Sequence, residues 1–167
     1  LLEDGGQAVG RVAAFIDRLA VEAWGEPVGL FGHYECPPDE SASRLLLTAA
    51  QEWLKQRGMQ LMRGPWSFVS QEWGLVLEGF SPPPVIMAPY NPAYYNNHMI
   101  AFGLQKVKDL LCYEIDVAKG DRIPARILEL TDTIARRYKV HVRQVDMRHY
   151  DQEVRNIIEL SNLSIID

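Results

Sequence analysis

The pattern of apolar and polar residues in the opening part of the chain predicts three β-strands. Residues 1–4 and 7–17 are two short runs, and the Gly5–Gly6 pair between them is a turn signal that predicts a hairpin. Residues 28–36 form the third run, which Pro37 and Pro38 end. Alternation in this run places one set of side chains on one face and a second set on the other. The first set is Val28, Leu30, Gly32, Tyr34 and Cys36, and the second is Gly29, Phe31, His33 and Glu35.

Apolar residues recur at helical spacing in the next segment. The stripe consists of Leu45, Leu46, Ala49, Ala50, Trp53 and Leu54. Asp39 or Ser41 provides the N-cap of the predicted helix, and Gly58 is its stop signal. Residues 59–64 predict a short buried strand, and residues 65–89 form a long connection.

Two further helix and strand pairs are predicted in the rest of the chain. A helix opens with Asn91 as its cap and Pro92 in its first turn, and it closes at Gly103, with Tyr95 on its inner face. The remaining elements are a strand at 104–116, a helix at 121–138, a strand at 140–147 and a last helix capped by Asp151. The fold class is therefore α/β, in the sense of a mixed sheet with helices packed on it, with residues 28–36 central and strands 59–64 and 104–116 beyond it.

Composition and charge narrow the function classes. The formal net charge is -5 and no stretch is rich in Lys or Arg, so a nucleic-acid partner is not expected. No apolar run reaches the roughly 20 residues of a membrane helix, and no membrane partner is expected. Two cysteines, Cys36 and Cys112, are too few for a disulfide framework, and together with the lack of a signal-peptide pattern they favour a cytoplasmic setting.

The element order of residues 1–116 resembles that of the GNAT (GCN5-related N-acetyltransferase) superfamily. Residues 2–11 are similar to its second and third strands, and residues 28–36 to its fourth. Residues 41–58 are similar to its CoA-side helix, and residues 91–104 to its late helix, with Leu104 in place of a Phe. The Gly64-Pro65-Trp66, Gly79-Phe80, Pro84 and Pro89-Tyr90-Asn91-Pro92 segments resemble an uncharacterised bacterial subgroup of longer proteins with two such folds.

This resemblance implies a domain organisation. Residues 1–118 would be a GNAT-like domain that lacks its first strand and helix, and residues 119–139 a linking helix. Residues 140–167 would be either the opening strand and helix of a second GNAT-like fold or a unit that completes the sheet edge. We expect the exposed edge to be covered by residues 141–163 or by a second copy of the chain, which makes a homodimer or a longer two-domain chain the expected assembly.

The resemblance also implies acetyl-CoA or another acyl-CoA as cofactor. The candidate pyrophosphate-binding residues are Ser41, Ala42, Ser43 and Arg44 at the start of the helix. The small residues Ser41 and Ser43 stand where the family has glycines. Asp39 and Glu40 place negative charge where a phosphate would bind, but acidic residues at a helix N-terminus are also favourable for purely structural reasons. A phosphate-binding turn and a capped helix without a nucleotide are both consistent with this sequence.

The candidate chemistry lies on the central strand and the late helix. Glu35 is the candidate general base toward an amine, with His33 on the same face. Tyr95 is the candidate general acid, one helical turn before Met99, which occupies the position of the family's usual Tyr. The candidate substrate pocket contains His33, Trp66, Trp73, Tyr90 and Asn91. The remaining histidines lack metal-ligand spacing, so no metal is expected.

Two functions follow from these residues. The first is an N-acyltransferase that moves an acyl group from acyl-CoA to a small-molecule amine, with backbone N–H groups binding the oxyanion. The alternative is a non-catalytic GNAT-like module that binds a ligand or a partner domain. Loss of the loop glycines and of the usual Tyr favours the alternative, and the element order favours the first.

Overall fold

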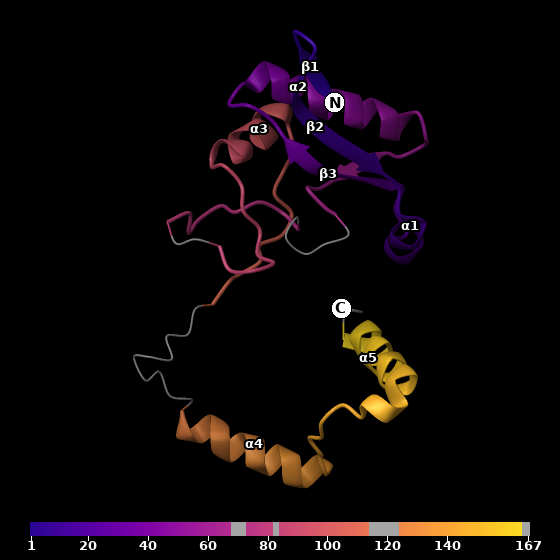
Figure 1. Ribbon diagram of the computed structural model, residues 1–167, viewed down its shortest axis with the longest axis vertical. Coiled ribbons are helices and arrows are strands. Elements are labelled where there is room, and N and C mark those ends of the chain that lie inside the picture. The colour runs from indigo at the N-terminus through magenta and orange to yellow at the C-terminus, as the bar shows by residue number, and fades with distance from the viewer. Residues whose placement is uncertain (68–72, 82–83, 114–123, 165–167) are drawn as a thin grey trace. The chain divides into compact units, whose positions relative to one another are not determined.

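The computed structural model describes residues 1–67, 73–81, 84–113 and 124–164 (Figure 1). The chain divides into two compact units, residues 1–109 and 110–167, which are described separately. The predicted domain boundary after residue 118 lies outside the described residues. The architecture of the first unit is mixed α/β, as the sequence predicts.

A four-stranded mixed sheet forms the centre of the first unit. Its strands are β1 (Leu2–Asp4), β2 (Gln7–Phe15), β3 (Val28–Glu35) and β4 (Leu61–Arg63), in the order β1-β2-β3-β4. The pairs β1–β2 and β2–β3 are antiparallel, and β3–β4 is parallel. Gly5 and Gly6 both have positive φ, 56° and 81°, which is the backbone that a tight two-residue hairpin turn requires. The predicted hairpin is confirmed.

The inner position of β3 is also confirmed, because β2 and β4 flank it. Among the described residues no strand pairs with the outer edge of β1, and the cover expected for that edge stays a prediction. The strand predicted at 104–116 is wrong for residues 104–113, which are irregular, and residues 114–116 lie outside the described residues. Val107 and Tyr113 are exposed there, since alternation alone does not supply a neighbouring strand.

Three helices accompany the sheet in the described part of this unit. Helix α2 (Glu40–Lys55) contacts β1 and β2 along its inner side, and α3 (Tyr94–Phe102) contacts α2 (Figure 1). Helix α1 (Arg18–Trp24) is an addition to the predicted elements, and it begins at the cap Asp17, whose carboxylate accepts hydrogen bonds from the Leu19 and Ala20 amides. None of its residues is buried, so the sequence has no apolar stripe that predicts this helix.

Local capping signals locate the start of α2 and the end of α3, whereas α2 ends at Lys55 with Gln56 as its C-cap, before the predicted stop signal Gly58. Asp39 caps α2, as one of the two predicted candidates, and Gly103 closes α3 in the left-handed conformation with φ 101°. Asn91 does not cap α3, which corrects that prediction: the cap position is Ala93, and the Asn91 Oδ1 atom accepts a hydrogen bond from the Val76 amide instead.

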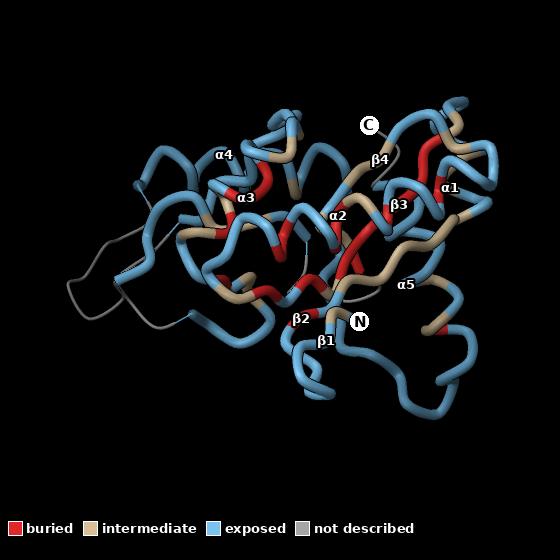
Figure 2. Tube along the Cα trace, turned by 90° about the horizontal axis from the view of Figure 1, so that it is seen from above, coloured by how far each residue is buried: buried red, intermediate tan, exposed pale blue. Residues whose placement is uncertain are grey.

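The hydrophobic core lies between β3, α2 and α3. Figure 2 shows buried stretches on β3 and on one side of α2. The cluster contains Phe31, Tyr34, Cys36, Ala42, Leu46, Leu47, Tyr95 and Met99. Helix α2 thus buries the side that carries Leu46, whereas Leu45 and Trp53 of the predicted stripe are exposed.

The second unit consists of α4 (Ala125–Tyr138), a 3-10 turn η3 (Met147–His149) and α5 (Tyr150–Ser164). The strand predicted at 140–147 is wrong: residues 140–146 are irregular, and Val142 is fully solvated at 97% exposure. Asp146 caps η3 by accepting from the Arg148 amide. Helix α5 begins one residue before its predicted cap, Asp151, and the ion pair Arg143–Glu153 (2.9 Å) ties it to the preceding segment. No helix in the described parts of the chain is both long and apolar enough to cross a bilayer.

Candidate functional site

A β-bulge in β3 shapes the site. Arg11 of β2 pairs with Glu35 and Ala13 pairs with Gly32, so β3 has one residue more than β2 across this interval. His33 lies within the interval with φ 50°, in the left-handed region. The bulge shifts the alternation of side chains in the second half of β3.

The shift corrects the predicted faces of this strand. A Cβ added to Gly29 would meet Leu54 of α2, and the Tyr34 hydroxyl is bonded to Ser43 of α2. Gly29 and Tyr34 are an odd number of positions apart, so an unbroken strand would place them on opposite faces. Because of the bulge at His33, both face α2.

The two predicted catalytic side chains are in direct contact. The Tyr95 hydroxyl of α3 donates to the Glu35 Oε2 atom at 2.9 Å and accepts from the Cys36 amide at 3.1 Å. The other carboxylate oxygen of Glu35 lies 3.8 Å from the Arg11 guanidinium. Tyr95 is buried, at 4% exposure, whereas the Glu35 side chain is 62% exposed. The pair therefore connects the interior to the surface through one hydrogen bond.

Burial also sets the protonation state of the phenol. Desolvation raises the pKa of Tyr95 to about 12, with the neighbouring Glu35 adding to the rise and the bond from the Cys36 amide opposing it. The phenol is therefore protonated throughout the neutral range and holds a proton that it can donate. The adjacent Tyr94 hydroxyl donates to the Cys36 carbonyl at 2.9 Å.

A second polar group, which the sequence analysis missed, lies next to this pair. The Tyr34 hydroxyl donates to the Ser43 Oγ atom at 2.7 Å and lies 2.9 Å from the His98 Nδ1 atom. All three residues are buried. One signal was available, because His98 is three residues after Tyr95 and so lies on the same inner face of α3. The pairing with Tyr34 depends on the bulge and could not be predicted from spacing.

The buried His98 predicts a dependence of stability on pH. Burial lowers the pKa of His98 in the folded state, so the unfolded state binds more protons below its own pKa of about 6.5. The contribution of His98 is therefore complete above that pH and is lost as the pH falls below it. We expect the free energy of unfolding in urea to fall from pH 7.5 to pH 5.5, and to fall less in a His98→Asn variant, whose amide can still bond Tyr34. The exposed His141→Asn variant is the control, and equal pH dependence in all three proteins would contradict the expectation.

The N-terminus of α2 holds the predicted pyrophosphate residues, and their polar groups are engaged. The Asp39 carboxylate accepts from the Ser41 amide at 2.8 Å and from the Ala42 amide at 3.4 Å. The Ser43 amide donates to the Asp39 backbone carbonyl at 3.0 Å. The Arg44 guanidinium donates to the Glu40 carboxylate and to the Ala101 carbonyl of α3. A pyrophosphate group at this turn would have to displace the Asp39 carboxylate from the Ser41 and Ala42 amides.

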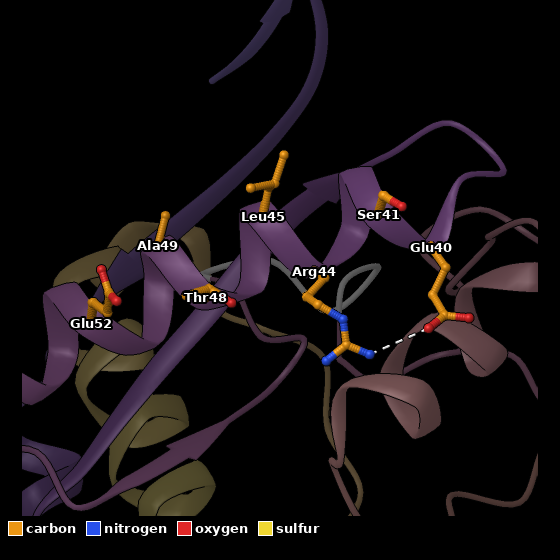
Figure 3. A pocket seen from close by; sticks show the side chains of 7 residues that line it. All are labelled: Glu40, Ser41, Arg44, Leu45, Thr48, Ala49 and Glu52. Carbon is orange, nitrogen blue, oxygen red and sulfur yellow. Dashed lines mark hydrogen bonds and ion pairs between the residues drawn. The ribbon is translucent and has the colours of Figure 1, made fainter.

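A shallow depression follows the outer side of the same helix (Figure 3). Its lining is Glu40, Ser41, Arg44, Leu45, Thr48, Ala49 and Glu52, all from α2. The dashed line in Figure 3 marks the ion pair between Arg44 and Glu40, 3.3 Å long. Because one helix supplies the whole lining, this is an open surface rather than an enclosed site.

The structure distributes the predicted pocket residues over different roles. Trp66 and Trp73 stack with ring centroids 5.1 Å apart, and the Trp73 indole donates to the Ser67 carbonyl. Asn91 is buried and braces the connection through the Val76 amide, whereas Tyr90 is exposed. His33 occupies the bulge. The two tryptophans stack on each other, and Asn91 stabilises the connection between β4 and α3.

Comparisons with known proteins find similarity to two curated bacterial proteins. No family model matches it, and no solved structure matches it. It is 34% identical over 158 residues to Protein YghO of Escherichia coli strain K12, which covers 94% of this chain and 40% of that protein. It is 33% identical over 166 residues to Bacterial ceramide synthase of Caulobacter vibrioides, which covers 95% of this chain and 41% of that protein. The chain thus spans about two fifths of the length of these curated relatives.

Proposed function

We propose that this chain carries the reacting residues of a GNAT-like N-acyltransferase, which moves an acyl group from acyl-CoA to an amine. The observation that carries the proposal is the hydrogen bond of 2.9 Å between Tyr95 and Glu35. It joins a protonated phenol to a solvent-accessible carboxylate at the end of an inner strand. Such a pair combines an acid and a base that exchange a proton through one hydrogen bond.

The reaction needs one proton removed and one supplied. The amine nitrogen attacks the thioester carbonyl, and Glu35 accepts the proton that the nitrogen loses. Tyr95 donates its proton to the departing sulfur, and Glu35 then returns a proton to Tyr95 along their hydrogen bond. The products are an amide and a free thiol, and the protein ends in its starting protonation state.

The name of one relative supports a class of acceptor. A ceramide is an amide of a long-chain amino alcohol, so a ceramide synthase joins an acyl group to such an amine. We therefore propose a long-chain amino alcohol as the acceptor of this chain and a long-chain acyl-CoA as the donor.

The alternative, a non-catalytic binding module, is favoured by one observation. The Asp39 carboxylate occupies the Ser41 and Ala42 amides that a pyrophosphate would use. For acyl-CoA to bind there, Asp39 must release these amides, and Asp39 and Glu40 must tolerate the negative phosphates.

A calorimetric titration separates the two functions. If acyl-CoA binds at α2, replacing Asp39 by Asn and Glu40 by Gln should tighten binding about tenfold, because each charge at about 6 Å costs about 0.7 kcal/mol in water-like surroundings. The Glu52→Gln variant is a control of equal charge type on the same helix, away from the N-terminus.

The module predicts a different result for the same variants. There, the Asp39→Asn side chain keeps an oxygen that can cap α2, so the free energy of unfolding should hardly change, and no acyl-CoA binds to any of the proteins. Heats of binding for acetyl-CoA and for longer acyl-CoAs, measured beside urea unfolding, distinguish these outcomes.

A further inference from the structure

The connection between β4 and α3 exposes an apolar loop, which we define as residues 84–90. Val85 is 75% exposed and Ile86 is 94% exposed, and Met87 and Tyr90 are exposed as well. Isolated exposed apolar residues are common, but several large ones in a row on a short loop are not. Contact with an apolar partner would remove these side chains from water, which is energetically favourable.

The stretch around the loop lacks charge. No Asp, Glu, Lys or Arg occurs between Glu78 and Lys106, although charged residues make up 23% of the chain. A surface that binds anionic groups would contain Lys or Arg, and a surface loop in water would contain some charge of either sign. The composition instead fits an uncharged apolar environment.

The conformation of the loop places apolar side chains at its corner. The Ala88 amide donates to the Val85 carbonyl at 3.1 Å, which closes a turn with Ile86 and Met87 at its central positions. Met87 has φ 65°, a conformation that Gly or Asn normally adopts in turns. The turn therefore projects its largest apolar side chains where small or polar residues are usual.

The loop is attached to the candidate site. The Asn91 Oδ1 atom accepts from the Val76 amide, and the Asn96 Nδ2 atom of α3 donates to the Val76 carbonyl at 2.8 Å. These bonds fix the connection on both sides of the loop to the helix that carries Tyr95. A molecule that holds the loop therefore also orients α3.

We propose that the apolar loop inserts into the surface of a lipid bilayer. A nearly fully solvated tip such as Ile86 is poorly covered by a flat protein surface, whereas a bilayer closes around it. Tyr90 has the amphipathic ring that is enriched at the boundary of the headgroups. Such insertion needs no spanning helix. It replaces the expectation of no membrane partner, which rested only on the lack of a spanning segment in the sequence. Membrane insertion of the loop could bring a long-chain amine to Glu35, and this role rests on the proposed function. Binding of the loop to the bilayer does not depend on that function.

Flotation with vesicles of pure phosphatidylcholine tests the proposal. The chain should float with these vesicles, equally at 0.1 M and 0.5 M salt, because the loop carries no charge. A Val85→Ser/Ile86→Ser variant should bind the vesicles at least about tenfold more weakly. Val142→Ser removes an equally exposed apolar side chain from the second unit and should bind like the unaltered chain.

Each other outcome overturns the proposal. Absence of flotation, equal flotation of the loop variant, or binding only to anionic phosphatidylglycerol vesicles that salt abolishes would each do so. Light scattering could show that the unaltered chain is a dimer and that the loop variant is a monomer. That result would make the loop a contact between copies of the chain. Circular dichroism confirms that the variants are folded, and no substrate is present, so this test fails or succeeds independently of acyl transfer.

Discussion

A Gly32→Ala variant is expected to lose about 3 kcal/mol of stability or more. A Cβ atom at Gly32 would lie 1.8 Å from the backbone oxygen of Trp66, and a backbone atom cannot move aside as a side chain does. The Trp66 amide also donates to the Phe31 carbonyl at 2.7 Å, so the two segments cannot separate without losing this bond. The free energy of unfolding in urea measures the loss.

Gly29→Ala is the matched control on the same strand. Its Cβ would meet three atoms of the buried Leu54 side chain, the nearest at 2.3 Å, and a side chain near the end of α2 can shift further than a backbone oxygen can. We expect a smaller loss, of about 1 kcal/mol. Equal losses in the two variants would show that Trp66 does not hold its backbone against β3.

The second large effect concerns Glu35 and Tyr95, the proposed base and acid. Glu35→Gln and Tyr95→Phe should each lower the rate of acyl transfer by about 100-fold or more, because each removes one member of the proton route. The double variant should be little worse than either single one, since the two groups act as a unit. The effect should fall on kcat rather than on KM, and initial rates over a range of amine concentrations separate these parameters.

Two controls accompany these variants. Tyr94→Phe removes a neighbouring phenol whose hydroxyl donates to the Cys36 carbonyl and does not bond Glu35, and it should retain most of the rate. Glu35→Gln should hardly change the free energy of unfolding, because its side chain is largely exposed. A loss of rate that follows stability across the series would make Glu35 and Tyr95 structural residues.

Local signals in the sequence predicted the local features of the fold. The Gly5–Gly6 turn, the Asp39 cap and the Gly103 closure each depend on neighbouring residues, and each is present. The inner position of residues 28–36 was predicted from the element order, and in the structure β3 is buried on both faces. Turn and cap chemistry is short-range, and this is why it can be read from one sequence.

Features that depend on distant partners were missed. Residues 104–113 and 140–146 have apolar residues at strand-like positions, but a strand exists only where a neighbour pairs with it. The bulge at His33 is a property of the pairing with β2, and it decides which face Tyr34 occupies. The bond from Tyr34 to His98 joins residues far apart in the chain and therefore lay outside any spacing argument.

Product formation tests the central claim most directly. The chain is incubated with a long-chain acyl-CoA and a long-chain amino alcohol, and mass spectrometry measures the N-acyl product beside the free CoA thiol. The proposed function predicts equal amounts of amide and thiol from the unaltered chain, and at most about one hundredth of both from Glu35→Gln. Thiol release without amide, or equal product from the Glu35→Gln variant, would contradict it.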